Sequence, residues 1–431
     1  MKILSIIGTR PEALKIGPVL RALGATPHME SIVCSTGQHR ALLQHALAHF
    51  GLKPDVDLAL MRRGQAPDQL LAHLLLRLGP TIQRVRPDWI LAVGDTTSVL
   101  GASLAAAHHR VRFAHIEAGL RTDSPWDPFP EEFNRRITSV LADLHFAPTP
   151  QARQNLLQEN ISIERIVVTG NPIVDTLRHF CRQPAPRLTA LWRKLGINLR
   201  LANQPRLLVV TFHRRENIGR PMQEICAALR ELARSYAGAV KILCLVHPNP
   251  AVGRPARCEL ADVPHLVLSR PLDYPAMIAV LQRAHLVLTD SGGLQEEAPY
   301  LHVPALILRN CTERPEGIAA GVAQLVGTSR LRIVASVRRL LDDPAAHQAM
   351  TKPFTGYGDG RAAERIIGAL WERSFVPGVN HPAQFTGEDL PRKNSPSLLL
   401  ENSESLLAAQ VENSEQSPFP LRHANSLRSA V

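Results

Sequence analysis

Several features that would point to common classes of protein are scarce or missing in this sequence. Aromatic residues make up only 4% of the 431 residues, which is too few for the base-stacking surfaces of most nucleic-acid-binding proteins. No apolar run is long enough to cross a bilayer, so we expect no membrane as a partner. The six cysteines form no Cys-x-x-Cys pair. Such usage is typical of a reducing compartment without structural zinc, and we expect a cytoplasmic protein.

Motifs for bound metals and for nicotinamide cofactors are also missing. None of the 18 histidines has the i, i+4 spacing with a glutamate that marks a common zinc site. No Gly-x-Gly-x-x-Gly follows the first apolar run, so a dinucleotide has no recognisable motif. The net charge is +11, and the arginines are dispersed rather than gathered in runs. We therefore expect no metal, no cofactor and no nucleic acid, and an anionic metabolite as ligand.

Short apolar runs alternate with helical patterns along most of the chain. Such alternation is typical of βαβ units and of doubly wound parallel sheets, so the predicted fold class is α/β with two Rossmann-like domains. The first series has strands at 3–7, 31–35, 89–93, 111–116 and 144–147, and helices at 11–23, 40–50, 96–108 and 131–142. The second has strands at 206–211, 240–246, 265–268, 285–289 and 305–308, and helices at 222–235 and 274–283.

The composition divides the chain into four parts. We predict one domain over residues 1–170 and another over 171–355, with a linker near 170–205. A last helix follows a glycine-rich turn within 356–373. From 374 to 431 the chain is rich in polar residues and proline and repeats the tetrapeptide Glu-Asn-Ser-Glu, so we predict a disordered tail. Ligands of open α/β sheets bind beyond the carboxyl ends of the strands, so two facing sheets would share one cleft.

The segment 285–299 contains the clearest pattern for an anion site. An apolar strand is followed by Ser291, Gly292 and Gly293, and a helical pattern begins at once. A helix N-terminus offers unpaired N–H groups, and glycines lack the Cβ atoms that would keep an anion away. The pattern predicts a phosphate site, with Glu297 one turn further on to bind vicinal hydroxyls such as those of a ribose. For this segment alone, an ordinary strand–turn–helix corner is the alternative.

The first strand is followed by the start of a helix that carries two cations. Thr9 and Glu12 match a capping box, and the proline between them is favoured in a first turn. Arg10 and Lys15 would then lie near a helix N-terminus that already favours anions. A well-capped helix with two solvated basic residues is an equal alternative.

Three acidic positions follow strands or begin a helix in the first series. Asp95 and Glu117 each come directly after a predicted strand, so their carboxylates reach the same edge of the sheet. Asp95 alone would be a helix cap, and Glu131 suits the dipole of its helix, whereas Glu117 has no capping role. Three converging carboxylates predict acid–base chemistry, because crowding raises the pKa of at least one of them.

Basic residues follow strands of the second series. His213 comes directly after the strand at 206–211 and precedes Arg214 and Arg215. This pattern would bind a departing diphosphate, or it is an ordinary polar strand end. Arg314 lies downstream of the predicted phosphate site and adds another cation.

Nine motifs, taken in their order along the chain, resemble those of the bacterial UDP-N-acetylglucosamine 2-epimerases. These motifs are GTRPEALKIGPV, TGQHR, GDTTS, HIEAGLR, PEEFNRR, HRRE, TDSGGLQEEAP, TERPEG and YGDGRAAERI, over about residues 1–373. The resemblance implies the GT-B fold with its active site in the interdomain cleft, and a last helix at 356–373 that crosses back to the first domain. It also implies a cytoplasmic homodimer that interconverts UDP-N-acetylglucosamine and UDP-N-acetylmannosamine for surface polysaccharide.

The resemblance further implies a role for each matching residue. It implies nucleotide-sugar contacts from Arg10, Lys15, Arg135 and Arg314, catalytic carboxylates at Asp95, Glu117 and Glu131, a histidine near the diphosphate at His213, a phosphate turn at Ser291, Gly292 and Gly293, and a ribose ligand at Glu297. Met277 departs from the pattern, since the family usually has an aromatic residue there that packs on the uracil.

The implied reaction needs no cofactor. The C2 proton of the sugar has no neighbouring carbonyl and is too weakly acidic for direct exchange. A base can instead remove it while UDP leaves C1, and the resulting glycal takes UDP back. Glu117 is the expected base and Asp95 or Glu131 the acid, with cations for the leaving group. The alternatives are a hydrolysing epimerase that releases N-acetylmannosamine and UDP, and a glycosyltransferase of the GT-B fold.

Overall fold

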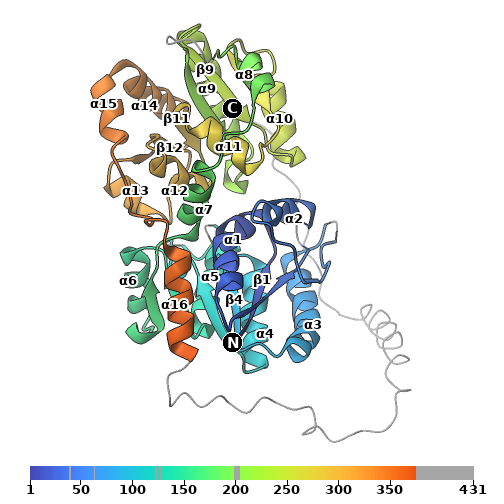
Figure 1. The fold of residues 1–431 in the computed structure, drawn as a ribbon. Coiled ribbons are helices and arrows are strands. Elements are labelled where there is room, and N and C mark those ends of the chain that lie inside the picture. Colours follow the sequence, from blue (N-terminus) through green and yellow to red (C-terminus); the bar gives the residue numbers. More distant parts are fainter. Residues whose placement is uncertain (38–39, 63, 123, 127, 199–203, 375–431) are drawn as a thin grey trace, which may run out of the picture. The chain divides into compact units, whose positions relative to one another are not determined.

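The computed structural model describes residues 1–374 except 38–39, 63, 123, 127 and 199–203 (Figure 1). The predicted disordered tail lies outside the described residues apart from Ser374, and Gln38 and His39 of the TGQHR motif lie outside them as well. Within the described part of the chain, no helix is long and apolar enough to cross a membrane.

The first half of the chain forms a sheet of seven parallel strands in the order β3-β2-β1-β4-β5-β6-β7. Its strands are β1 (Lys2–Ile7), β2 (Glu30–Ser35), β3 (Val56–Asp57), β4 (Trp89–Val93), β5 (Arg112–Ile116), β6 (Leu144–Ala147) and β7 (Ile166–Val168). Its helices are α1 (Arg10–Ala25), α2 (Arg40–Ala48), α3 (Pro67–Val85), α4 (Thr97–His108), α5 (Glu131–Leu141), α6 (Pro150–Gln158) and the short η1 (Ile163–Arg165).

The second half forms a sheet of six parallel strands in the order β10-β9-β8-β11-β12-β13. Its strands are β8 (Arg206–Thr211), β9 (Val240–Leu245), β10 (Leu266–Ser269), β11 (Ala284–Thr289), β12 (Ala305–Ile307) and β13 (Ala323–Leu325). The helices from here on are α7 (Pro172–Cys181), α8 (Thr189–Leu195), η2 (Arg215–Asn217), α9 (Arg220–Ser235), α10 (Pro250–Leu260), α11 (Tyr274–Leu281), α12 (Gly292–Tyr300), α13 (Pro315–Ala319), α14 (Arg330–Asp342), α15 (Pro344–Met350) and α16 (Ala362–Ser374).

Helices cover both faces of each sheet, so the central strands have no polar face. All five residues of β4 are buried, as is usual for a strand inside a parallel sheet. One apolar core packs α1, α7 and α16 against the first sheet, and another packs α3 and α4 against its other face. The second sheet is covered by α9, α10 and α14 on one face and by α8, α11 and α12 on the other. The predicted α/β class with two doubly wound parallel sheets is confirmed.

The stretch 170–205 is not the plain linker that we expected, because it contains α7 and α8. Helix α7 buries Ile173, Val174, Leu177 and Phe180, whose spacing gives one apolar face. It packs against α1 and α16 and also against α12, and so touches elements of both halves of the chain. Our division of the chain into domains near residue 170 stays a prediction.

Helix α16 returns from the end of the second half to the first sheet (Figure 1). Ile366 and Leu370 are fully buried in the core that also contains residues of β1. Asp175 of α7 accepts hydrogen bonds from the N–H groups of Ala362 and Ala363 at 3.1 and 3.0 Å. These bonds pair two of the free donors at the start of α16, so α7 fixes where that helix begins.

Candidate active site

The predicted site residues follow the carboxyl ends of strands in both sheets. Arg10 begins α1 directly after β1, while Asp95 and Glu117 follow β4 and β5. His213 follows β8, and Ser291 follows β11. Parallel strands end at one edge of a sheet, so this arrangement gathers side chains that are far apart in the sequence.

Glu117 has an unusual backbone conformation for a residue with a side chain. Its φ is 68°, in the left-handed region that normally favours glycine. A non-glycine residue in this region is strained by about 1–3 kcal/mol and persists only where its surroundings enforce it. The Glu117 side chain is buried at the end of β5.

Cations from both halves of the chain meet at the Glu117 carboxylate. Lys15 places its Nζ at 2.6 and 2.5 Å from the two oxygens, and Arg314 donates its Nη2 to Oε1 at 3.2 Å. Asn171 donates its Nδ2 to the same Oε1 at 3.0 Å. Burial favours a raised pKa for Glu117, but the charges of Lys15 and Arg314 outweigh it and lower the pKa below the ordinary value. Glu117 is therefore ionised at neutral pH.

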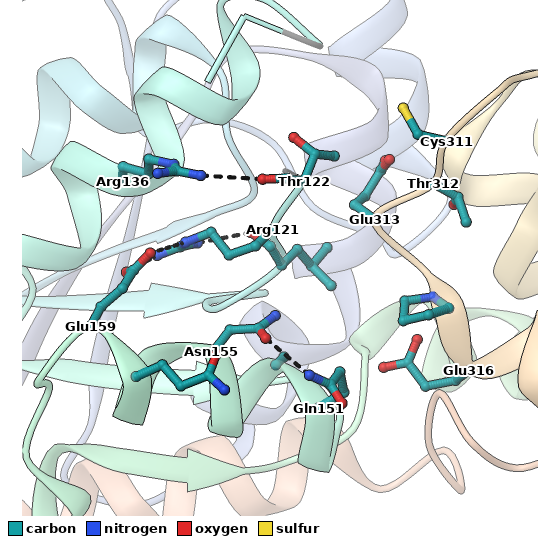
Figure 2. A pocket seen from close by; sticks show the side chains of 14 residues that line it. Arg121, Thr122, Arg136, Gln151, Asn155, Glu159, Cys311, Thr312, Glu313 and Glu316 are labelled. Atoms are coloured by element: carbon teal, nitrogen blue, oxygen red, sulfur yellow. Dashed lines mark hydrogen bonds and ion pairs between the residues drawn. The ribbon is translucent and has the colours of Figure 1, made fainter. Parts of the chain in front are cut away.

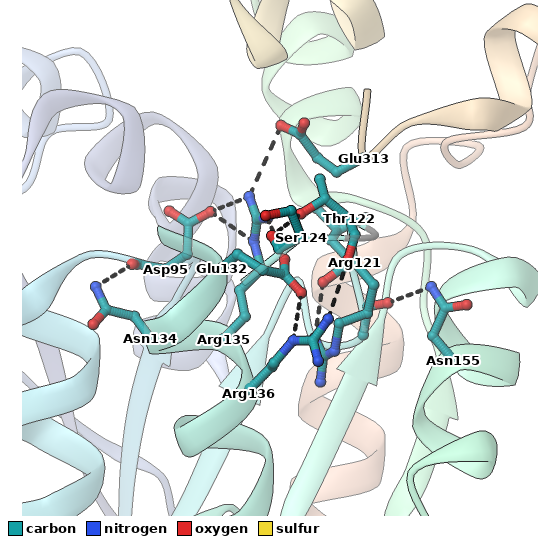
Figure 3. A network of polar contacts seen from close by, with 12 residues as sticks. Asp95, Arg121, Thr122, Ser124, Glu132, Asn134, Arg135, Arg136, Asn155 and Glu313 are labelled. Atoms are coloured by element: carbon teal, nitrogen blue, oxygen red, sulfur yellow. Dashed lines mark hydrogen bonds and ion pairs between the residues drawn. The ribbon is translucent and has the colours of Figure 1, made fainter. Parts of the chain in front are cut away.

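Asp95 binds Arg135 instead of capping a helix. Its Oδ2 accepts from Nη2 and Nε of Arg135 at 2.6 and 3.0 Å (Figure 3). The N-cap position of α4 is Thr96 and not Asp95. Asn134 fixes the same turn by donating its Nδ2 to the Asp95 carbonyl at 2.8 Å. Burial opposes ionisation, but Arg135 and then Lys15 stabilise the charge, so the pKa of Asp95 is lowered.

Glu131 differs from the other two predicted carboxylates. It begins α5 and is half-buried, and within the described contacts its side chain bonds to no other predicted residue. Burial, followed by the nearby charge of Asp95, raises the pKa of Glu131. One of the three carboxyl groups therefore has a raised pKa. A raised pKa keeps a carboxyl group protonated, as a proton donor must be.

Arg314 links the predicted phosphate turn to the carboxylates. Its Nε donates to Oε1 of Glu296 at 2.5 Å, and its Nη1 bonds to Glu313. A Cβ at Gly292 would lie 2.7 Å from that Nη1, so the glycine is required for the guanidinium to lie against the start of α12. Ser291 makes no side-chain cap, which leaves donors at this N-terminus for an anion.

Glu297 lies one turn into α12, beside a phenol from α11. Its Oε1 accepts from the Tyr274 hydroxyl at 3.2 Å. Burial raises the pKa of Glu297 to about 7, and the charges of Arg10 and Lys15 partly offset the rise. Arg10 therefore acts on the same side chain that we expect to bind a ribose.

His213 is positioned by a buried aspartate rather than by the carboxylates of the first sheet. Its Nδ1 lies 3.2 Å from Oδ1 of Asp290, whose Oδ2 accepts from the N–H groups of His213 and Arg214 at 2.8 and 2.9 Å. The imidazole stacks on His247 with ring centroids 5.3 Å apart. Asp290 thus fixes the strand end on which the histidine and the arginine lie.

Sequence reasoning missed several residues that hold this site together. Asn171 fell inside the expected linker, yet its amide bridges Glu117 and Glu296 at 3.0 Å each while its Oδ1 caps α7. The Asn-Pro pair at a helix start is a capping signal that could have been read. Glu296 and Glu313 lie in recognised motifs but gave no signal of their own, because their partners are distant in the sequence.

A polar cavity of about 470 Å³ lies beside this network (Figure 2). Its walls include Arg121, Asn155 and Glu159 from the first half and Glu313 and Glu316 from the second. Glu313 is thus shared between the cavity and the cluster at Arg314. Over the described part of the chain, no three side chains of the types that ligate metals lie close enough to hold an ion.

Two doubly wound parallel sheets, with charged residues of both meeting at the strand ends, define a GT-B-like α/β protein. A glycosyltransferase of kitacinnamycin shares this fold, with a TM-score of 0.55 at 14% identity over 86% of this chain and 98% of that chain.

Comparisons with known proteins identify the family to which the chain belongs within this class. The family model for UDP-N-acetylglucosamine 2-epimerase matches residues 21–371. The UDP-N-acetylglucosamine 2-epimerase of Salmonella typhimurium is 44% identical over 371 residues, which span 86% of this chain and 98% of that protein. The UDP-GlcNAc 2-epimerase of Neisseria meningitidis, solved bound to UDP-GlcNAc, has a TM-score of 0.81 at 37% identity over 86% of this chain and all of that one. The chain belongs to the UDP-N-acetylglucosamine 2-epimerase family, and the resemblance seen in its motifs is confirmed.

Proposed function

We propose that this protein reversibly epimerises UDP-N-acetylglucosamine to UDP-N-acetylmannosamine by eliminating and re-adding UDP through a glycal. The observation that carries the proposal is the strained Glu117, which lies between Lys15 of α1 and Arg314 beside the α12 N-terminus. A base is thereby joined to the cations that a leaving diphosphate requires. Relatives solved with UDP-GlcNAc or with UDP-GlcNAc and UDP support this substrate.

Glu117 is the base in this proposal. Its pKa is held low by two cations, so it is ionised but a weak base while both pairs persist. A diphosphate at the phosphate turn, which comprises Ser291, Gly292 and Gly293, competes for Arg314 and loosens the pair with Glu117. Losing a cation raises the basicity of Glu117 at the moment the substrate is in place.

Glu131 and Asp95 divide the remaining proton chemistry. The raised pKa of Glu131 suits a donor that returns a proton to the glycal on the face opposite Glu117. Asp95 stays ionised through its pair with Arg135, and its charge helps to keep Glu131 protonated.

The UDP portion is bound by the second sheet and by α1. The diphosphate lies at the phosphate turn with Arg314, Arg10 and His213, and Glu297 accepts from the ribose hydroxyls. These groups orient the leaving UDP and stabilise its charge. The reaction needs no cofactor, because the same UDP that leaves returns.

The test is to incubate the protein with UDP-N-acetylglucosamine in D2O and follow the products by NMR. We expect UDP-N-acetylmannosamine with deuterium at C2 in both nucleotide sugars. Free N-acetylmannosamine as the main product would identify the hydrolysing reaction instead. No exchange at C2 without an added acceptor would favour a glycosyltransferase and end the proposal.

We further propose a homodimer in the cytoplasm that supplies precursors for surface polysaccharide. Phe133 and Val140 lie seven positions apart on α5 and are 43% and 74% exposed. An apolar pair on one helix face suits a contact with a second copy. Analytical ultracentrifugation should give a dimer for the wild type and a monomer when both residues are replaced by glutamate.

A further inference from the structure

One buried carboxylate lies among four arginines at the meeting point of the two halves of the chain. Oε2 of Glu313 accepts from Arg309 at 2.8 Å, and its Oε1 bonds to Arg314. The same Oε1 is 3.8 Å from Nη2 of Arg135 and 4.0 Å from Nη2 of Arg214. The side chain of Glu313 is only 1% exposed, so these cations replace the water that would otherwise solvate its charge. We call Arg135, Arg214, Arg309 and Arg314 the arginine cluster.

The arginine cluster lies where the leaving group is held in the proposed function. Arg314 touches the glycine at the start of α12, and Arg135 binds Asp95 at the end of β4 (Figure 3). Two donors of the cluster, Nη2 of Arg309 and Nε of Arg214, are buried with no hydrogen-bond partner among the described residues. Buried donors of this kind are costly unless an acceptor reaches them, and the oxygens of a diphosphate are such acceptors.

A carboxylate at this position opposes the binding of a diphosphate. It repels the anion directly, and it already occupies guanidinium groups that the anion would bind. Burial favours a raised pKa for Glu313, but Arg314 and the other arginines reverse this and hold the pKa well below the ordinary value. The negative charge is therefore present at neutral pH.

We propose that Glu313 is an internal counter-ion that competes with the substrate's diphosphate for the arginine cluster and sets the affinity for UDP. The inference rests on the proposed function, since that function places the diphosphate against Arg314, which is one member of this cluster. Glu313 keeps the arginines aligned before the substrate arrives, and its charge offsets part of their attraction for the nucleotide. UDP is thereby held firmly enough to return to the glycal, and the nucleotide-sugar product can still dissociate. Glu313 is a positioning residue, because it acts through the arginines.

The test is calorimetric titration of UDP into the wild type and into Glu313→Gln. The substitution keeps the shape of the side chain and removes its charge, so we expect UDP to bind at least about tenfold more tightly. We also expect KM for UDP-N-acetylglucosamine to fall and kcat to fall with it, because product release slows. If Glu313 were only a scaffold for the arginines, its loss would misplace them and UDP would bind more weakly.

A matched control and a charge-preserving variant show whether a change in UDP affinity is due to the buried charge of Glu313. Glu216 also pairs with Arg309, at 3.3 Å, but its side chain is 37% exposed. Because water screens this charge, Glu216→Gln is expected to change UDP affinity less than twofold. Glu313→Asp keeps the buried charge and should therefore bind UDP close to the wild-type affinity.

Should Glu313→Gln fail to fold, the same substitution is made in an Arg309→Gln background, which removes the buried pair together. The double variant should bind UDP about tenfold more tightly than Arg309→Gln alone. Equal or weaker UDP binding in the variant that lacks Glu313 overturns the inference. A wild type that binds no UDP overturns the proposed function instead, so the two failures are distinguished.

Discussion

Arg314 donates its Nη2 to Oε1 of Glu117 at 3.2 Å, across 197 positions of the sequence. The contact joins the loop after β12 to the end of β5, and hence the anion site of the second sheet to the proposed base of the first. Because Arg314 is shared between Glu117 and Glu296, a phosphate that engages it changes the charge around both carboxylates. In the proposed mechanism, this one side chain couples the binding of the leaving group to the activation of the base.

The first prediction concerns the base. Glu117→Gln keeps the volume and most hydrogen bonds of the side chain but cannot accept the C2 proton. We expect kcat to fall between about 100-fold and 10,000-fold, and deuterium exchange at C2 to fall with it, while UDP still binds. NMR and calorimetry measure the two effects separately.

The control is Glu364→Gln, which breaks an exposed pair with Arg361 and should leave both measurements unchanged. Wild-type exchange in Glu117→Gln would remove Glu117 from the proposed mechanism.

The second prediction concerns Asn171, whose amide N–H groups separate two carboxylates. Asn171→Asp keeps the oxygen that caps α7, since Oδ1 accepts from the N–H of Ile173 at 3.1 Å. It replaces the donor to Glu117 and Glu296 with a third negative charge. We expect the free energy of unfolding at pH 7 to fall by about 3–5 kcal/mol, as when a buried charge is left uncompensated.

Acidification should restore part of the stability lost in Asn171→Asp. Crowding raises the folded-state pKa of this carboxyl cluster, so its favourable contribution is present at low pH and is lost as the pH rises. Urea unfolding at pH 5 and pH 7 gives the comparison. Asn171→Ser retains a capping hydroxyl without a charge and should show a smaller loss that does not depend on pH.

The fold could be predicted because buried parallel strands are visible in the sequence as short apolar runs. The five residues of β4 are all apolar, and β11 has the apolar residues Leu286, Val287 and Leu288 at its centre; the predicted ranges of both strands differ from the observed ones by at most one residue. Helices such as α7 were harder to assign. The Asn-Pro pair at the start of α7 was the local signal for this helix, but its packing against elements from both halves of the chain could not be read from the sequence.

Residues of the candidate site could be predicted to lie together only where they follow the carboxyl ends of neighbouring strands. Asp95 and Glu117 could be placed together, because neighbouring parallel strands end at one edge. The partners that set their charge state could not, since Glu117 meets Arg314 and Asp95 meets Arg135 through contacts between distant segments. A motif records which residue is present and not which ion pair it forms.

The third prediction separates the two glycines of the phosphate turn. A Cβ at Gly292 would lie 2.7 Å from Nη1 of Arg314, whereas a Cβ at Gly293 would lie 3.7 Å from Glu297, at ordinary contact distance. Arg314 is buried and held by three carboxylates, so it cannot withdraw freely. We expect Gly292→Ala to cost about 1–3 kcal/mol of stability and to weaken UDP binding at least about tenfold.

Gly293→Ala is the matched variant for this comparison. It adds the same methyl group one position along the helix, so any loss due to helix propensity is shared. Thermal unfolding and UDP titration of both variants should place Gly293→Ala closer to the wild type. The reverse order would show that Arg314 does not depend on the open face of Gly292.

The fourth prediction is a pH dependence of stability that arises at Glu12. Its buried carboxyl accepts from the N–H groups of Gly8 and Thr9 at 2.5 and 3.0 Å and from the Thr96 hydroxyl at 2.5 Å. Burial raises its pKa from 4.5 to about 7. A raised folded-state pKa gives a contribution that is complete below pH 4.5 and is lost as the pH rises through 7.

Glu12→Gln removes this titration while keeping an oxygen acceptor and gaining a donor toward Thr96. Other titrating groups are common to both proteins, so the difference in unfolding free energy between wild type and variant isolates Glu12. Between pH 5 and pH 8 the wild type should lose about 2–3 kcal/mol relative to Glu12→Gln, at about 1.4 kcal/mol for each pKa unit. Urea unfolding of both proteins across this range measures the difference, and parallel curves would mean that the carboxyl titrates in its ordinary range. Because Glu12 ties the turn that carries Arg10 to the turn that carries Asp95, the same ionisation should shift the pH profile of turnover, and Glu12→Gln should flatten it near pH 7.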